Sequence, residues 1–305
     1  MKKGLLIILI VIVVLILVII AGLAIMTRSQ ALDIIQHPPQ ERPEIEQDPA
    51  DLGMDFELVG IQTEDGYNLV GWFIPGENGA GVMIQHGSPG GRQDGLHEAS
   101  LLNAAGYSVL LGSFRAHDEC EGEVISFGFY EQADTKAWHQ YLLTRAEVDP
   151  DRIGLFGESM GGGTSLLYAA GDPGVAAVAT GSAFALTQEV VEKFIEFETD
   201  LPPALIPVLA KFIVFWAERE ANFSSQELDT ESVIDQISPV PVLIIHGGSD
   251  DKIGPAVGRQ LFEAATEPKE LVWIEEAGHV NFEDFQPDVY RDSLINFFDE
   301  HLLGD

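Results

Sequence analysis

Cysteine and basic residues are the residue types that this chain has least of, relative to its size. Its 305 residues include one cysteine, Cys120, so no disulfide can form within the chain. Carboxylates on both sides of this cysteine disfavour a thiolate, and we expect the thiol to be unreactive. Lys and Arg number 16 against 49 Asp and Glu, a formal charge of −33. Such a surface repels phosphate, which argues against nucleic acid and anionic lipid headgroups as partners.

The patterns that hold metals and nucleotides are also missing. The histidines show no paired spacing of the H-E-x-x-H type, so we expect no catalytic metal. No glycine-rich phosphate signature follows the first strand of the α/β region, and no nucleotide cofactor is expected. The acidic segment 118–123 could hold a hard cation, but a solvated loop is the better interpretation. We therefore predict neither a metal nor a cofactor.

One long apolar run stands near the N-terminus. Residues 5–26 form 22 apolar positions that would span about 33 Å as a helix. We predict a membrane anchor over residues 1–28, with a single-pass topology at the cell membrane. Lys2 and Lys3 precede the run, so the remaining chain should be extracytoplasmic. The alternative is a signal peptide cleaved near Ser29-Gln30-Ala31, followed by secretion.

The chain beyond the anchor divides into a linker and one domain. Residues 29–52 are rich in proline, glutamine and acids, which predicts an extended linker. Residues 53–305 suffice for one α/β domain. Residues 54–63 and 67–73 flank a turn signal and predict a β-hairpin.

Strand and helix patterns then alternate along the domain. The predicted strands are 80–85, 107–112, 152–156, 175–180, 242–245 and 271–274; the predicted helices are 96–105, 131–145, 162–170, 255–265 and 287–302. Near-continuous apolar strands predict a mostly parallel central sheet with helices on both faces. Residues 184–236 interrupt the alternation with helical patterns rich in aromatic side chains. We interpret this insertion as a lid, with ordinary packing on the core as the alternative.

The segment Gly157-Glu158-Ser159-Met160-Gly161 joins an apolar strand to a helical pattern of small residues. A serine on so tight a turn presents its hydroxyl as a nucleophile. Such a serine needs a base and an acid that orients the base. Asp250 and His279 each follow a predicted strand, so both should reach the carboxyl edge of the sheet beside Ser159. Asp251 is the alternative to Asp250.

Acyl transfer also requires N–H donors for the oxyanion. By position, Met160 supplies one, and Ser88 in the loop after strand 80–85 is the predicted second donor. We interpret His86 as a residue that braces this loop rather than as a catalyst.

Together these motifs resemble the serine α/β-hydrolase superfamily, in its prolyl-oligopeptidase and dienelactone-hydrolase-like branch, including Bem46-type membrane-anchored bacterial hydrolases. The resemblance rests on Asp65-Gly66, His86-Gly87, the Ser159 segment, the segment from His246 to Asp250, and Gly278-His279. One departure is the segment 113–118, where relatives often carry an Asp-x-Arg-x-His-Gly-like pattern. Arg115 and His117 match that pattern, whereas the first acid and the glycine do not.

The resemblance implies an α/β-hydrolase fold and cleavage of an ester, thioester or related acyl bond through an acyl-enzyme. A serine peptidase of the same fold is the alternative within the family. The alternative from another class is a non-catalytic, membrane-tethered binding protein. Because Ser159, Asp250 and His279 are all present, a small-molecule or acyl substrate is the leading prediction.

Overall fold

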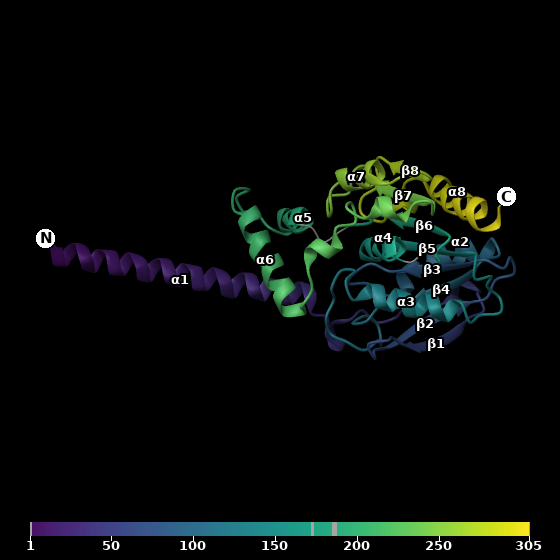
Figure 1. Ribbon diagram of the computed structural model, residues 1–305, viewed down its shortest axis with the longest axis horizontal. Helices are drawn as coiled ribbons and strands as arrows, with labels where there is room; N and C mark the ends of the chain where they lie inside the picture. Colours follow the sequence, from purple (N-terminus) through teal and green to yellow (C-terminus); the bar gives the residue numbers. More distant parts are fainter. Residues whose placement is uncertain (1, 172–173, 185–187, 305) are drawn as a thin grey trace.

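A single eight-stranded sheet forms the centre of the computed structural model, which describes residues 2–171, 174–184 and 188–304. The strand order is β1-β2-β4-β3-β5-β6-β7-β8 (Figure 1). The strands are β1 (Glu57–Gln62), β2 (Asn68–Ile74), β3 (Gly81–Gln85), β4 (Ser108–Gly112), β5 (Ile153–Glu158), β6 (Ala177–Gly181), β7 (Val242–Gly247) and β8 (Lys269–Ile274). The β1–β2 and β2–β4 pairs are antiparallel and all other pairs are parallel, so the predicted hairpin and mostly parallel sheet are confirmed.

Helices cover both faces of this sheet. On one face lie α2 (Leu96–Ala104) and α8 (Pro287–Phe298); on the other lie α3 (Glu131–Leu142), α4 (Met160–Gly171) and α7 (Ala256–Ala264). Successive strand residues alternate between the two cores: Phe156 of β5 packs in one and Leu155 in the other. Short 3-10 segments are Pro39–Glu41, Pro49–Leu52, Arg92–Gly95, Ser225–Leu228, Ile234–Ile237 and Phe282–Asp284, and a π turn spans Asp299–Leu303.

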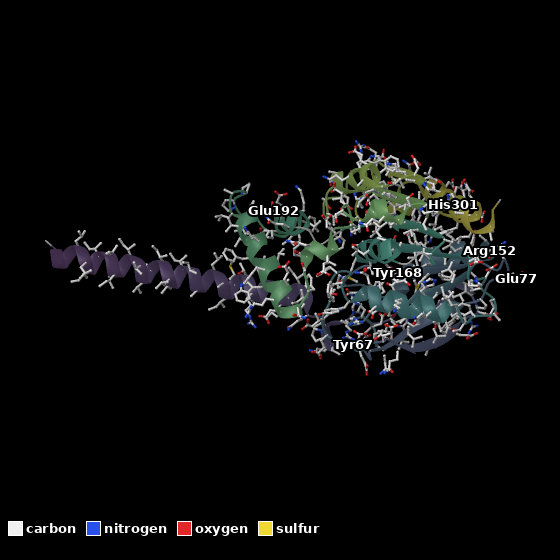
Figure 2. The ribbon with its side chains drawn as sticks, viewed as in Figure 1. Tyr67, Glu77, Arg152, Tyr168, Glu192 and His301 are labelled. Atoms are coloured by element: carbon white, nitrogen blue, oxygen red, sulfur yellow. The ribbon has the colours of Figure 1, made fainter. Side chains whose placement is uncertain are left out.

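The N-terminal helix α1 (Lys2–Ile35) is long and apolar enough to cross a membrane. Its first turns project away from the domain, and their side chains have no neighbouring element (Figure 2). The extended conformation predicted for residues 29–52 does not hold at its start, because the helix continues to Ile35. Ala31 and Ile35 are 0% and 1% exposed, and burial of this apolar face against the domain stabilises the helix.

A helical insertion stands between β6 and β7, as predicted. It contains α5 (Gln188–Glu198) and α6 (Ile206–Ala221); residues 185–187 of the predicted lid lie outside the described residues. Helix α6 packs against both α5 and the C-terminal part of α1 (Figure 1). Their contact residues share a third hydrophobic cluster that includes Ile195, Ile213 and Ala217. The insertion and α1 therefore form one packed unit at one end of the domain.

Candidate active site

Ser159 occupies the turn between β5 and α4. Its φ is 51°, a left-handed conformation that a residue other than glycine adopts only when its surroundings impose it. Small neighbours make the turn possible: a Cβ on Gly157 would lie 2.3 Å from the Gly161 carbonyl oxygen. A Cβ on Gly161 would lie 2.1 Å from the carbonyl oxygen of Gln85 in β3. The turn is thus pressed against the sheet with the serine at its tip.

His279 lies between the other two residues predicted to act with it. Its Nε2 is 2.9 Å from Ser159 Oγ, and its Nδ1 is 2.9 Å from Asp250 Oδ2. Ser159 is 8% exposed and Asp250 is fully buried, whereas Asp251 points to solvent. The three side chains come from the carboxyl ends of β5, β7 and β8 and form an unbroken chain of hydrogen bonds. This arrangement lets an imidazole accept a proton while a carboxylate orients the ring.

The Asp250 carboxylate is fully supplied with donors. Its Oδ1 accepts the backbone N–H groups of Lys252 and Ile253 at 3.1 and 3.2 Å, and its Oδ2 accepts the Ser182 hydroxyl at 2.9 Å. Burial alone would raise the pKa of Asp250, but these donors and His279 hold it below its ordinary value. Ser182 was not among the predicted residues, although it directly follows β6, the same strand-end position that indicated Asp250 and His279.

The two predicted oxyanion donors lie on either side of the serine. Met160 is the first residue of α4 and is fully buried. Across from it, the loop after β3 approaches closely, since a Cβ on Gly87 would lie 3.3 Å from Ser159 Cβ. Ser88 and Ser159 line the same cavity. The start of α4 and the loop after β3 are therefore both next to Ser159.

His86 braces this loop from behind. Its Nε2 accepts the Phe114 N–H at 3.1 Å, which leaves Nδ1 to donate to the Gly87 carbonyl at 2.7 Å. Its ring stacks edge-on against His117, whose ring meets His37 in the same way, with centroids 4.7 and 5.1 Å apart. Burial lowers the pKa of His117 and of His37, which favours the neutral form of both rings. The stack connects the segment after α1 to the loop beside the serine.

Two buried arginines brace the segment 113–118, where the sequence departs from its relatives. Arg115 pairs with the buried Asp134 of α3 at 2.7 Å. Arg92 pairs with Asp118 at 3.2 Å, and both of these side chains are 2% exposed. Asp118 therefore supplies a carboxylate to this loop although the first acid of the usual pattern is missing.

The serine opens into a cavity of about 570 Å³. Its lining is mainly apolar and comes from several parts of the chain that are distant in sequence. The end of α1 and the residues after it contribute Asp33, Ile34, Gln36, His37 and Glu41; the insertion contributes Val190, Val191, Phe194 and Phe197. The contribution of α1 was not predicted, because nothing in a local pattern reveals a contact between such distant segments.

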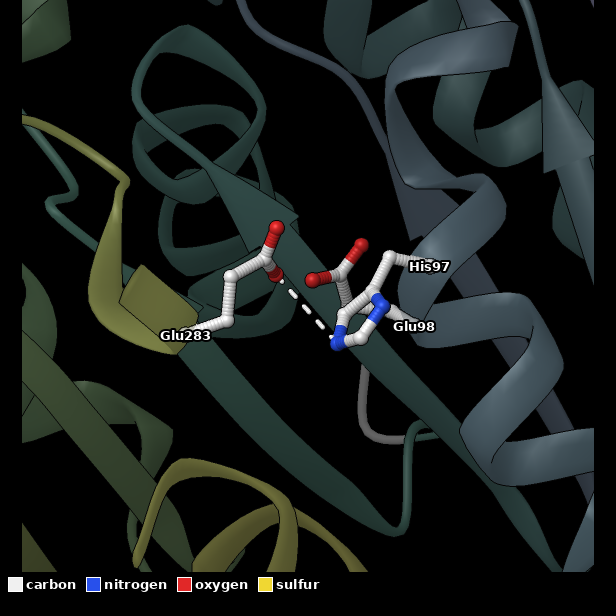
Figure 3. Close-up of side chains that lie close together, drawn as sticks. All are labelled: His97, Glu98 and Glu283. Carbon is white, nitrogen blue, oxygen red and sulfur yellow. Dashed lines mark ion pairs between the residues drawn. The ribbon is translucent and has the colours of Figure 1, made fainter. Parts of the chain in front are cut away.

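Two other groups of histidine and carboxylate side chains lie close together in the described part of the chain. Figure 3 shows His97, Glu98 and Glu283, in which His97 Nε2 is 3.2 Å from Glu283 Oε2. The second group is Glu270, Glu300 and His301. Both consist largely of exposed side chains, and the buried Glu98 already accepts the Tyr290 hydroxyl at 2.8 Å. Neither group carries a metal proposal.

Sequence comparisons find relatives over most of the chain. The X-Pro dipeptidyl-peptidase (S15) family matches residues 41–192, and the prolyl oligopeptidase family matches residues 125–305. The uncharacterised protein Rv2307c of Mycobacterium tuberculosis is 30% identical over 252 residues, which cover 79% of each chain. The uncharacterised protein YfhR of Escherichia coli O157:H7 is 29% identical over 250 residues, covering 79% of this chain and 80% of its own.

Solved structures share the fold. Esterase Pf2001 of Pyrococcus furiosus superposes with a TM-score of 0.70 at 22% identity, covering 86% of this chain and 98% of its own. At 22% identity the structural similarity shows a shared fold, whereas the sequence matches show common ancestry. With both in agreement, the chain belongs to the prolyl oligopeptidase family within the serine α/β-hydrolase superfamily.

Proposed function

We propose that the protein hydrolyses ester, thioester or related acyl bonds, with Ser159 as nucleophile. Ser159 Oγ attacks the carbonyl carbon while His279 Nε2 takes its proton, and Asp250 holds the imidazolium. The N–H groups of Met160 and Ser88 stabilise the oxyanion. His279 then protonates the leaving group, and water, activated by the same imidazole, releases the acyl group from Ser159.

One observation carries this proposal: the two 2.9 Å contacts that join Ser159, His279 and Asp250 at the wall of a cavity. A binding protein without catalysis has no need of a serine held at a strained φ within reach of a base. The geometry also supplies what an acyl transfer demands, namely a base, a buried charged acid and close backbone on both sides of the nucleophile.

The direct test is labelling of the purified full-length protein with a fluorophosphonate probe. We expect labelling of the wild type that is abolished in Ser159→Ala and after heat denaturation. Ser100→Ala, which changes an exposed helical hydroxyl bonded to its own turn, is the matched control and should label normally. A folded wild type that does not react, or equal reaction of Ser159→Ala, would refute a serine nucleophile.

A serine peptidase is the second candidate, and the two matched peptidase families favour it. The cavity supports an acyl substrate instead, because the larger part of its lining, including Ile125, Phe127 and Phe184, is apolar and can pack against an acyl chain. Parallel assays with aryl esters of increasing chain length and with X-Pro aryl amides separate the two. We expect ester turnover to exceed amide turnover by about 100-fold or more.

We further propose that α1 is a retained membrane anchor and that the domain is extracytoplasmic. Supporting retention, the Ser29-Gln30-Ala31 segment lies within α1 and Ala31 is fully buried, so cleavage there would remove a residue of the domain's own hydrophobic cluster. The mass of the mature protein should include residues near Met1. Protease added to intact spheroplasts should degrade the domain, and a mature N-terminus near Leu32 would contradict the anchor.

A further inference from the structure

An exposed apolar surface covers the helical insertion. Outside α1, twelve large hydrophobic side chains of the described residues are exposed, and seven of them fall between residues 194 and 215. These seven, which we call the insertion surface, are Phe194, Phe197, Leu201, Leu205, Val208, Phe212 and Phe215, each 37–51% exposed. Such clustering marks a contact surface, whereas single exposed hydrophobic residues are ordinary.

Helix α6 is apolar on two faces. Leu209 and Ile213 are buried in the cluster shared with α1 and α5. Val208, Phe212 and Phe215 have i, i+4, i+7 spacing, so they share a different face, which is uncovered. Packing within the chain thus explains one apolar face of α6 and leaves the other without a partner among the described residues.

The position of the insertion indicates what covers this face. Helix α6 lies against the part of α1 where the apolar run ends, and Leu23, within that run, packs on the shared cluster. An exposed ion pair of 2.8 Å between Arg28 and Glu220 also joins the two helices. Figure 1 shows α5 and α6 at the end of the domain from which the free part of α1 projects. A bilayer around residues 5–26 would therefore meet the insertion first.

A second cavity on this side adjoins the one that contains Ser159. A cavity of about 270 Å³ lies between α1 and the insertion, with Leu201, Leu209 and Ile213 among its walls. It shares Asp33, Ile34 and Phe194 with the cavity that contains Ser159. The two cavities are therefore neighbours, and the residues between them come from α1 and α5.

We propose that the insertion surface lies in the headgroup region of a lipid bilayer and that the acyl chain of a bilayer-resident ester reaches Ser159 between α1 and α5. Water cleaves the ester bond, releasing a fatty acid and the alcohol. This inference rests on the proposed function and on α1 as an anchor. The bilayer that the insertion surface contacts is zwitterionic, because a chain with a net charge of −33 repels an anionic bilayer. Tethering by α1 makes the docking intramolecular, so a small apolar area suffices.

The docking is tested without any catalytic readout. Burial raises the pKa of Cys120 to about 12, and this thiol is 2% exposed, so a second, introduced cysteine can be labelled selectively. Full-length Phe215→Cys carrying a solvatochromic dye in phosphatidylcholine vesicles should be quenched by iodide at least fivefold less than Leu58→Cys, an exposed site on β1. Equal quenching would overturn the docking. A second copy of the chain could also protect the dye from iodide. Such protection would disappear when added lipid dilutes the protein in the vesicles, and that result would also overturn the docking.

The route of the substrate is tested by comparing the turnover of an ester held in vesicles with that of a soluble ester. Phe212→Gln with Phe215→Gln should reduce turnover of a long-chain ester held in vesicles about tenfold, while turnover of a soluble short-chain ester stays within twofold. Leu58→Gln with Leu143→Gln, an exposed apolar pair outside the insertion, should change neither rate. Parallel loss of both activities would contradict the proposal. A wild type that fails fluorophosphonate labelling refutes the hydrolase but leaves the iodide result interpretable.

Discussion

Ser182 helps to orient the Asp250 carboxylate, which also accepts two backbone N–H groups and contacts His279. Its hydroxyl is 2.9 Å from Asp250 Oδ2, the same oxygen that His279 contacts. Two acceptor directions on one oxygen are thereby occupied, which fixes the carboxylate's rotation. We regard Ser182 as a positioning residue, because it would act on the reaction only through Asp250.

Removal of that hydroxyl should therefore impair turnover more than binding. A hydrogen bond to a charged group contributes about 1.5–3 kcal/mol, so Ser182→Ala is expected to lower kcat about tenfold or more with little change in KM. The matched control is Ser108→Ala, which also removes a buried hydroxyl, bonded to the Gly76 N–H and remote from Asp250. If both variants lose stability but neither loses kcat, the positioning role is wrong.

Glu98 gives a second prediction at this scale, for stability against pH. Burial raises the pKa of Glu98, whose neighbours include His97, Glu283 and the Tyr290 hydroxyl. A carboxyl with a raised folded-state pKa stabilises the fold while protonated, and this contribution is lost as pH rises from its ordinary pKa through the raised one. Wild-type Tm should therefore fall more than that of Glu98→Gln as pH rises above the ordinary pKa of a glutamate.

The slope in Glu98→Gln should be reduced but not abolished, because burial also raises the pKa of Glu158. Glu77→Gln is the control, since Glu77 is exposed at the far edge of the domain (Figure 2). Thermal melts across the pH range provide the measurement. Parallel Tm profiles for wild type and Glu98→Gln would show that Glu98 is charged in the folded protein.

At the scale of elements, α4 is fitted to the sheet by its glycines. Gly161 has no room for a side chain, because the obstacle is the backbone of β3, 2.1 Å from a Cβ. Gly171, at the other end of the same helix, has nothing within 4 Å of its Cβ position. The two glycines of α4 therefore allow a comparison within one helix, between a position with no space for a side chain and a position with open space.

Alanine at these two positions should have opposite effects. Overpacking at Gly161→Ala is expected to cost about 1–3 kcal/mol or more, because β3 cannot retreat within a paired sheet. Gly171→Ala should leave stability unchanged or raise it by up to about 1 kcal/mol through helix propensity. Urea midpoints of the two variants provide the comparison, and equal midpoints would argue against close packing at the turn.

Elements were predictable where burial leaves a local pattern. Strands covered on both faces read as uninterrupted apolar runs, so the run 242–245 indicated β7 (Val242–Gly247) and with it the place of Asp250. His279 followed from the apolar run 271–274, although β8 is an edge strand in which only Ile274 is buried. The continuation of α1 to Ile35 could not be predicted, because proline and acidic residues nearby indicate a linker while the stabilising contacts come from α6. Packing between distant segments leaves no such local signal.

At the scale of the whole molecule, α1 belongs to the domain as well as to the proposed anchor. Its last turns bury Ala31 and Ile35 and line the cavity with Asp33 and Ile34. The boundary between anchor and domain is therefore a position within a helix and not a flexible segment.

Two truncations should separate these roles. A chain that starts at residue 22 loses only exposed side chains among the described residues of α1, so its Tm should match that of the full-length protein. A chain that starts at residue 37 also loses the buried Ala31 and Ile35, which should cost about 2–5 kcal/mol. We expect a clear drop in Tm and altered short-chain ester kinetics only for the shorter chain. Equal Tm values would mean that α1 contributes nothing to the fold.

The unbroken helix from Gly4 to Ile35 also governs where the reaction can take place. A domain on a flexible stalk varies in its height above the membrane and in its tilt. A helix that enters the domain without a break fixes both the height and the tilt. With residues 5–26 in the bilayer, Ser159 stays at a constant height above the membrane plane and moves only laterally. An acyl bond at that height above the membrane is then accessible to Ser159. The same bond held closer to the membrane or farther from it is not.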